Sequence, residues 1–138
     1  MIDPDEKRIA MVFKRTSVPN VSKSNLLKYR QYLLGHLDKN TILTGREDFP
    51  WEEMYVSGHG NIKEYERLKK TNPSYTDEYL LQDISKDETE EYDLIATAKR
   101  ISDGSIFSMG LSWLTTKDEK CKDFQLLDDF ATWAVNWN

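Results

Sequence analysis

Two groups of carboxylates are the residues of this chain whose types and spacing suit a chemical role. Six acids fall within eleven residues between Asp83 and Asp93, and Lys86 is the only base among them. A second group, the adjacent Asp128 and Asp129, stands in an aromatic segment near the C-terminal end. Calcium takes six to eight oxygen ligands, which loop carboxylates and carbonyls supply. The residues that we consider as calcium ligands are Asp87, Glu88, Glu90, Glu91, Asp93, Asp128 and Asp129.

Both groups also have an interpretation without a ligand. The spacing of the acidic stretch is not that of an EF-hand loop, and a solvated hairpin loop with charges that discourage strand pairing explains it equally. Asp128 and Asp129 are expected to open a helix, where unpaired N–H groups and the helix dipole stabilise carboxylates. Neighbouring side chains on a helix point about 100° apart, so the two aspartates are poor partners in catalysis. They become a binding site only if the acidic stretch reaches them.

Other catalytic or metal-binding chemistry has little support in the sequence. The soft metal ligands are His36, His59 and Cys121, which are far apart and form no paired motif. The chain contains no nucleophile elbow and no glycine-rich phosphate loop. We therefore expect a protein that is not an enzyme.

Charge and composition limit the compartment and the partners. The chain has 138 residues and a net charge of −5, which suits one acidic domain and disfavours nucleic acid or an anionic membrane as the main partner. The single Cys121 forms no disulfide within the chain. No apolar run approaches the length of a membrane span, and the acidic start is unlike a secretory signal. We expect a cytoplasmic protein.

The order of the expected elements predicts an α+β domain. A helix capped by Ser22 or Ser24 leads into a block of short strands, and a helix from about Phe124 follows them. Asp103-Gly104 between two strand-like runs indicates a hairpin. The expected strands lie at 41–44, 49–56, 78–84, 92–101 and 105–109. We predict a small, strongly curved antiparallel sheet or an SH3-like, partly open barrel, flanked by an N-terminal and a C-terminal helix.

The remaining segments complete the predicted domain organisation. Residues 1–21 are expected to be an N-terminal extension in which 9–13 form an edge strand or a helical turn. Residues 22–138 are expected to form a single domain. The polar connection 61–77 is expected to hold a helical turn at 63–70.

Four segments together resemble a known family. They are YRQYLL from residue 29, DFPWEE from residue 48, FSMGLSWL from residue 107 and QLLDDFATW from residue 125. In this order and spacing they resemble the small acidic calcium-binding proteins described from cyanobacteria, which have relatives across many bacteria. The resemblance covers about residues 25–137. It implies an SH3-like barrel flanked by helices, with calcium bound through surface carboxylates.

Two functional hypotheses follow. The first is a non-enzymatic cytoplasmic protein that binds calcium weakly, chiefly through the acidic stretch, with Asp128 and Asp129 as second choices. The alternative is a protein-interaction module without a metal. It would use aromatic residues around Phe49, Trp51 and Tyr55, or its carboxylate surface, to meet a basic partner.

Overall fold

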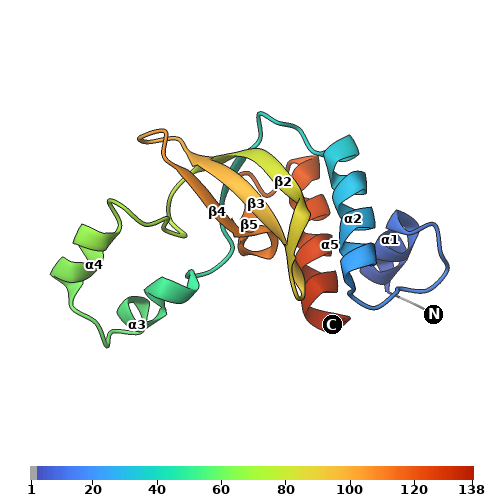
Figure 1. The fold of residues 1–138 in the computed structure, drawn as a ribbon, viewed down its shortest axis with the longest axis horizontal. Coiled ribbons are helices and arrows are strands. Elements are labelled where there is room, and N and C mark those ends of the chain that lie inside the picture. Colours follow the sequence, from blue (N-terminus) through green and yellow to red (C-terminus); the bar gives the residue numbers. More distant parts are fainter. Residues whose placement is uncertain (1–2) are drawn as a thin grey trace.

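An open antiparallel sheet packed against helices organises the chain (Figure 1). The computed structural model describes residues 3–138, which form five α-helices, two short 3-10 helices and five strands. The elements are α1 (Pro4–Val12), α2 (Lys23–His36), β1 (Ile42–Gly45), η1 (Pro50–Glu52), α3 (Glu53–Val56), α4 (Ile62–Leu68), β2 (Tyr79–Glu90), β3 (Asp93–Arg100), β4 (Ile106–Gly110), η2 (Leu111–Trp113), β5 (Leu114–Thr116) and α5 (Lys122–Asn136).

The sheet has the strand order β4-β3-β2-β1-β5, and every neighbouring pair is antiparallel. Its longest part is the β2–β3 hairpin, whose register runs from Tyr79 opposite Arg100 to Glu90 opposite Asp93. The two edge strands do not pair with each other, so the sheet does not close into a barrel. The predicted α+β fold with a curved antiparallel sheet and flanking helices is confirmed, in its open form.

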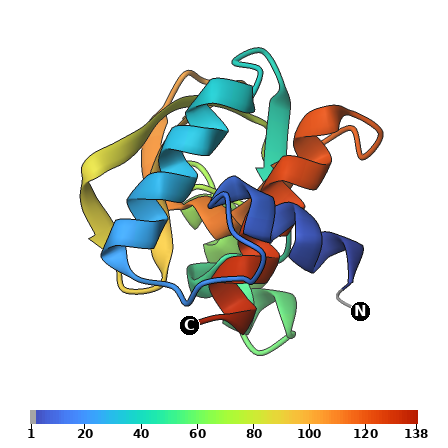
Figure 2. The ribbon, with the colours of Figure 1, turned by 90° about the vertical axis from the view of Figure 1, so that its right-hand side faces the viewer.

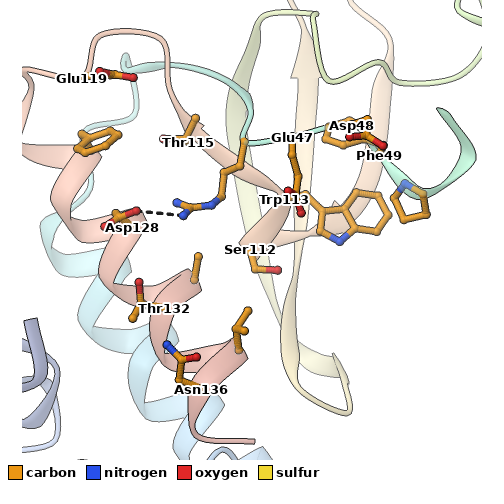
Figure 3. Close-up of a pocket in the computed structure, with 15 residues that line it drawn as sticks. Glu47, Asp48, Phe49, Ser112, Trp113, Thr115, Glu119, Asp128, Thr132 and Asn136 are labelled. Carbon is orange, nitrogen blue, oxygen red and sulfur yellow. Dashed lines mark hydrogen bonds and ion pairs between the residues drawn. The ribbon is translucent and has the colours of Figure 1, made fainter. Parts of the chain in front are cut away.

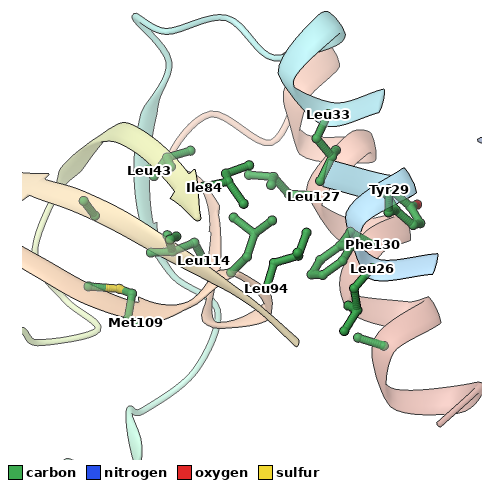
Figure 4. Close-up of a cluster of buried hydrophobic side chains, with 14 of the residues drawn as sticks. Leu26, Tyr29, Leu33, Leu43, Ile84, Leu94, Met109, Leu114, Leu127 and Phe130 are labelled. Atoms are coloured by element: carbon green, nitrogen blue, oxygen red, sulfur yellow. The ribbon is translucent and has the colours of Figure 1, made fainter. Parts of the chain in front are cut away.

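The hydrophobic core lies between the sheet and the helices α2 and α5 (Figure 4). Leu26 and Leu33 of α2 are fully buried there, as are Leu127 and Phe130 of α5. Each of the five strands contributes at least one buried side chain to this core, for example Ile84 of β2. None of the helices within residues 3–138 has the length and apolar character needed to cross a membrane.

Helix α2 begins where the sequence predicts. The Ser22 side chain accepts a hydrogen bond from the backbone N–H of Asn25 at 3.1 Å, which satisfies one of the free donors of the first turn. Tyr29 of α2 is buried against Phe130 and Trp133 of α5, with ring centroids 5.1 Å apart in both pairs. The cap therefore fixes the start of the helix, and the aromatic contacts fix its position on α5.

The N-terminal segment packs against the same core (Figure 2). Residues 9–13, expected as an edge strand or a helical turn, belong mostly to helix α1, and Ile9 is fully buried. The Phe13 ring lies 5.3 Å from the Trp133 ring, centroid to centroid. The Trp133 indole N–H donates to the carbonyl of Pro19 at 2.8 Å. The described part of the segment 1–21 thus supplies both apolar and polar contacts to α5.

A projecting limb, formed by residues 50–77 with η1, α3 and α4, extends away from the sheet (Figure 1). The prediction of a strand at 49–56 is wrong, because these residues form η1 and α3. Pro50 suits the first position of a helical turn, and the fully buried Glu52 carboxylate accepts a hydrogen bond from the Phe49 N–H at 3.1 Å. The helical turn predicted at 63–70 is present as α4.

Glu52 also connects the parts of the limb to one another. Its carboxylate accepts from the Tyr65 hydroxyl of α4 and from the Tyr75 N–H, each at 3.0 Å. The Tyr65 ring stacks on the Tyr55 ring of α3, with centroids 5.0 Å apart and an interplanar angle of 6°. Glu52 is therefore the polar centre around which the short helices of the limb are arranged.

Arg100, at the end of β3, joins the limb to the sheet. Its guanidinium group is buried and donates to the carbonyl oxygens of Lys69, Lys70 and Asn72 at 2.9–3.0 Å. It also donates to the carboxylates of Asp77 and Asp103, the latter through two nitrogens. One side chain thus satisfies carbonyl groups that follow α4, where no helix hydrogen bonds remain available to them.

The turn between β3 and β4 confirms the predicted hairpin at Asp103-Gly104. It is longer than a two-residue turn, because the Arg100 N–H donates to the carbonyl of Ser105 at 2.8 Å. Gly104 has φ +75°, a conformation that glycine adopts at no steric cost. The Asp103 carboxylate binds Arg100, so this residue serves the limb as well as the turn.

Candidate functional site

Asp128 and Asp129 lie in the middle of α5, so the prediction that they begin this helix is wrong. Helix α5 starts at Lys122, and Asp123 is the acid of its first turn. The dipole effect is confined to the first turn and does not account for the aspartate pair. Each aspartate instead binds its own arginine.

The two arginine contacts differ in geometry and burial. Arg8 of α1 donates to both carboxylate oxygens of Asp129, at 2.8 Å and 3.0 Å, and Gln125 donates to the same carboxylate at 2.8 Å. Arg46 reaches Asp128 with one nitrogen only, at 3.0 Å. Asp129 is buried, whereas Asp128 remains partly exposed. Because Arg8 and Gln125 occupy its oxygens, the Asp129 carboxylate is a poor ligand for a further cation.

The acidic stretch forms the distal half of the β2–β3 hairpin instead of a loop. Asp87, Glu88, Glu90 and Glu91 are exposed there, and none of them forms an ion pair within residues 3–138. Asp93 is different, because it accepts from the N–H and hydroxyl of Ser112, the hydroxyl at 2.6 Å. Burial raises the pKa of Asp93, although the bonds from Ser112 oppose the shift.

The seven predicted ligands therefore occupy separate environments. The hairpin acids face solvent, Asp93 is held by Ser112, and Asp128 and Asp129 are held by arginines. Across residues 3–138, no three side chains of His, Cys, Asp or Glu come together in a way that would hold a metal ion. Calcium binding stays a prediction. The hairpin is its most suitable place, because the exposed acids there form no ion pair within residues 3–138.

A calcium titration followed by amide NMR distinguishes these environments. We expect no saturable shift at Asp128 or Asp129, because Arg8 holds both oxygens of Asp129 and because neither aspartate belongs to a group of three acidic, His or Cys side chains within residues 3–138 that could hold a metal ion. Any saturable change in the millimolar range is expected at residues 87–91, with magnesium as the control ion. Saturable shifts at the aspartate pair would contradict this assignment, and unchanged hairpin amides would remove the calcium hypothesis.

A groove of about 670 Å³ lies between α5 and the segment that leads from β1 into the limb (Figure 3). One wall is the exposed face of α5, including Asp128, Thr132 and Asn136. The opposite wall contains Trp113 and the segment 46–50. We call this hollow the α5 groove.

The lining of the α5 groove combines negative charge with an aromatic wall. Its four carboxylates are Glu47, Asp48, Glu119 and Asp128, and Arg46 is its only base. The Trp113 ring packs against the buried Phe49 ring, with centroids 5.2 Å apart. Such a mixture suits a ligand that carries both a positive charge and an apolar group.

Thr115 adds a polar feature to the same groove. Its hydroxyl oxygen is shielded from solvent and has no hydrogen-bond partner within residues 3–138. Buried polar groups are normally paired, so this hydroxyl is an exception in the wall of the groove. Thr115 lies on the short edge strand β5, opposite Thr44 of β1.

A smaller hollow of about 260 Å³ lies where α1, α2 and α5 meet. Tyr32, His36 and Met11 contribute to its lining, and the Tyr32 and His36 rings stack at 4.0 Å. The Arg8–Asp129 ion pair forms its polar side. The Arg8–Asp129 pair is already satisfied and the Lys122 ammonium group donates to the carbonyl of His36, so this hollow offers less to a charged ligand than the α5 groove does.

The aromatic residues considered for a protein interface are only partly available. Phe49 is fully buried, whereas Trp51 and Tyr55 are half-buried in the limb. The Trp51 indole N–H donates to the carbonyl of Pro73 at 2.6 Å. Phe49 therefore packs against Trp113, and the partly exposed aromatic side chains of the groove are Trp113 and Phe124.

The α5 groove was not predicted from the sequence, apart from Asp128. Its opposite wall comes from Arg46-Glu47-Asp48, a charged run between Gly45 and Phe49. That run is a sequence signal, because three consecutive charges between a strand and a buried aromatic residue indicate an exposed connection. Its position opposite α5 depends on the strand order, which the sequence alone does not provide.

No family model, curated protein or solved structure matches this chain.

Proposed function

We propose that this chain is a non-enzymatic, cytoplasmic protein-interaction module whose α5 groove holds a segment of a partner protein with basic and apolar side chains. The observation that carries the proposal is the joint lining of the groove by four carboxylates and the Trp113 wall. Charged groups of opposite sign fix the register of a bound segment and speed its encounter. The apolar wall supplies the burial that holds it.

The charge of the groove supports a basic partner. Four acids and one arginine give the lining a net charge of about −3, and the whole chain carries −5. A basic segment is therefore attracted by both the local and the overall field. An acidic segment would be repelled by both.

The size of the α5 groove suits a short segment of a partner protein better than a flat partner surface. A volume of about 670 Å³ falls within the range of about 300–1,000 Å³ that is typical of ligand sites. The groove is walled by α5 on one side and by Trp113 and Pro50 on the other. A few consecutive side chains fit between these walls.

Amide NMR with two synthetic peptides tests this function. The first alternates arginine and leucine, and the second has glutamate in place of arginine. We expect the basic peptide alone to shift residues of the groove, including Trp113 and Thr132, with binding that weakens as salt increases.

A charge-matched pair of variants provides the control. Asp48→Asn with Glu119→Gln removes two charges from the groove, and Glu88→Gln with Glu90→Gln removes two from the hairpin. We expect only the groove variant to weaken binding of the basic peptide clearly. Equal weakening by both variants would show a nonspecific charge effect and would overturn the proposal.

A further inference from the structure

The Arg46–Asp128 ion pair bridges the two walls of the α5 groove (Figure 3). It joins one nitrogen of Arg46 to one oxygen of Asp128 at 3.0 Å, and both side chains remain about one third exposed. An exposed contact of this kind contributes little to stability and exchanges readily. The adjacent Asp129 is held through both oxygens by Arg8 and is nearly buried. Of the two aspartates, only Asp128 is bound loosely enough to change partner.

The backbone at Arg46 is held while its side chain is left free to move. The Arg46 N–H donates to the carbonyl of Trp113 at 2.8 Å. Gly45 packs so closely on Tyr75 that a Cβ there would overlap the backbone of Tyr75. Movement of the guanidinium group therefore requires only side-chain rotation, and Glu47 and Asp48 are nearby in sequence as alternative partners.

Asp128 has unused capacity in this arrangement. A carboxylate accepts a bidentate pair of hydrogen bonds from an arginine, and Arg46 supplies one of them. A ligand that brings a guanidinium group in two-point geometry would use both oxygens of Asp128, which Arg46 does not.

From this geometry we infer that Arg46 occupies the place of an arginine of the partner. On binding, the partner's guanidinium group forms a two-point contact with Asp128, and Arg46 turns away from the groove. The exchange replaces one ion pair by another, so the charge around Asp128 is conserved. This inference rests on the proposed function and names arginine, in preference to lysine, as the recognised side chain. The planar fork of arginine matches a carboxylate, whereas the lysine ammonium group acts as a point charge.

Calorimetric titration with three peptides that differ at a single position tests the inference. They carry arginine, lysine or the neutral isostere citrulline at the central position and are otherwise identical. We expect the arginine peptide to bind most tightly and the citrulline peptide least tightly. With Asp128→Asn, the preference for arginine over lysine is expected to disappear.

Variants at Arg46 separate this inference from the proposed function. Arg46→Gln removes the internal competitor and is expected to tighten binding of the arginine peptide about two- to fivefold, the effect of an exposed ion pair. Arg67→Gln, on the exposed limb, is the control for the loss of one positive charge and is expected to have a smaller effect. The amide spectrum of each variant establishes that it is folded.

The outcomes are distinct. If Arg46→Gln leaves the affinity unchanged or lowers it while the peptide still occupies the groove, the competition by Arg46 is overturned and the proposed function stands. If no peptide binds the groove of the unaltered protein, the proposed function itself is overturned. If lysine and arginine peptides bind equally, the recognition of a guanidinium group is overturned.

Discussion

Replacing Arg100 by alanine is expected to lower the free energy of unfolding by about 3–5 kcal/mol, because removing one partner of a buried charge network leaves the others unpaired. The guanidinium group contacts three carbonyl oxygens and two carboxylates, so alanine leaves carbonyls such as that of Asn72 without a donor. A domain of this size is typically stable by only about 5–15 kcal/mol. Urea unfolding measures the loss as a lower midpoint.

Two further variants define the origin of this effect. Arg100→Lys keeps the charge but not the planar guanidinium group. We therefore expect its free energy of unfolding to lie between that of the unaltered protein and that of Arg100→Ala. Lys99→Ala changes the exposed neighbour on the same strand and is expected to alter stability by less than about 0.5 kcal/mol. A similar loss for Lys99→Ala and Arg100→Ala would show that the strand, and not the guanidinium contacts, determines the result.

Replacing Glu52 by alanine is expected to cost about 2–4 kcal/mol and to loosen the limb before the sheet. The backbone N–H groups of Phe49 and Tyr75 lose their acceptor, and a buried donor without a partner costs about 1–3 kcal/mol. Burial and the bond to Glu52 raise the pKa of Tyr65 to about 12, so its hydroxyl remains a donor at neutral pH and also loses its acceptor. Amide hydrogen exchange measures the loosening residue by residue.

The exchange pattern provides the control for this prediction. We expect faster exchange in α3 and α4 and little change in β2 and β3, because the hydrogen bonds of Glu52 reach Phe49, Tyr65 and Tyr75 and involve neither strand. Glu53→Ala changes an exposed neighbour and is expected to leave exchange almost unaltered. Uniform acceleration through the sheet would contradict a local role for Glu52.

Local signals predicted the helix α2 and the β3–β4 hairpin correctly. A Ser cap acts within four residues, and a turn glycine acts at its own φ angle, so both effects are readable without knowledge of the rest of the fold. The apolar face of α5 was predicted for the same reason, since Phe130 and Trp133 recur at helical spacing.

Features that depend on distant partners were not predictable. The segment 49–56 partly alternates like a strand, but Glu52 turns it into a helical start by accepting from Phe49 and from Tyr75, which is 23 residues away in sequence. The start of α5 was placed too late because the polar residues before Phe124 lack a recognisable cap, and the Cys121 side chain makes no capping bond. This difference of two residues does not account for Asp128 and Asp129, which were expected in the first turn because acids are stabilised there but lie six and seven residues after Lys122.

The candidate site was only partly accessible for the same reason. Asp128 was selected from its residue type, but its role depends on Arg46, which lies 82 residues earlier in the chain. The acidic stretch was selected from composition alone, whereas in the structure it runs along the β2–β3 hairpin, with Asp83, Glu90 and Asp93 paired across the strands and Asp87 and Glu88 in an irregularity of the register. Composition identifies which groups are charged, whereas the register determines which of them meet.

The four tryptophans lie in four different surroundings, which gives the protein a built-in set of optical reporters. Trp51 belongs to the limb, Trp113 to the wall of the α5 groove and Trp133 to the fully buried core. Trp137 is partly exposed near the end of α5. In a variant that retains a single tryptophan, the fluorescence would therefore come from one known position. The emission wavelength and the quenching of that fluorescence would distinguish occupation of the groove from opening of the limb and from unfolding of the core.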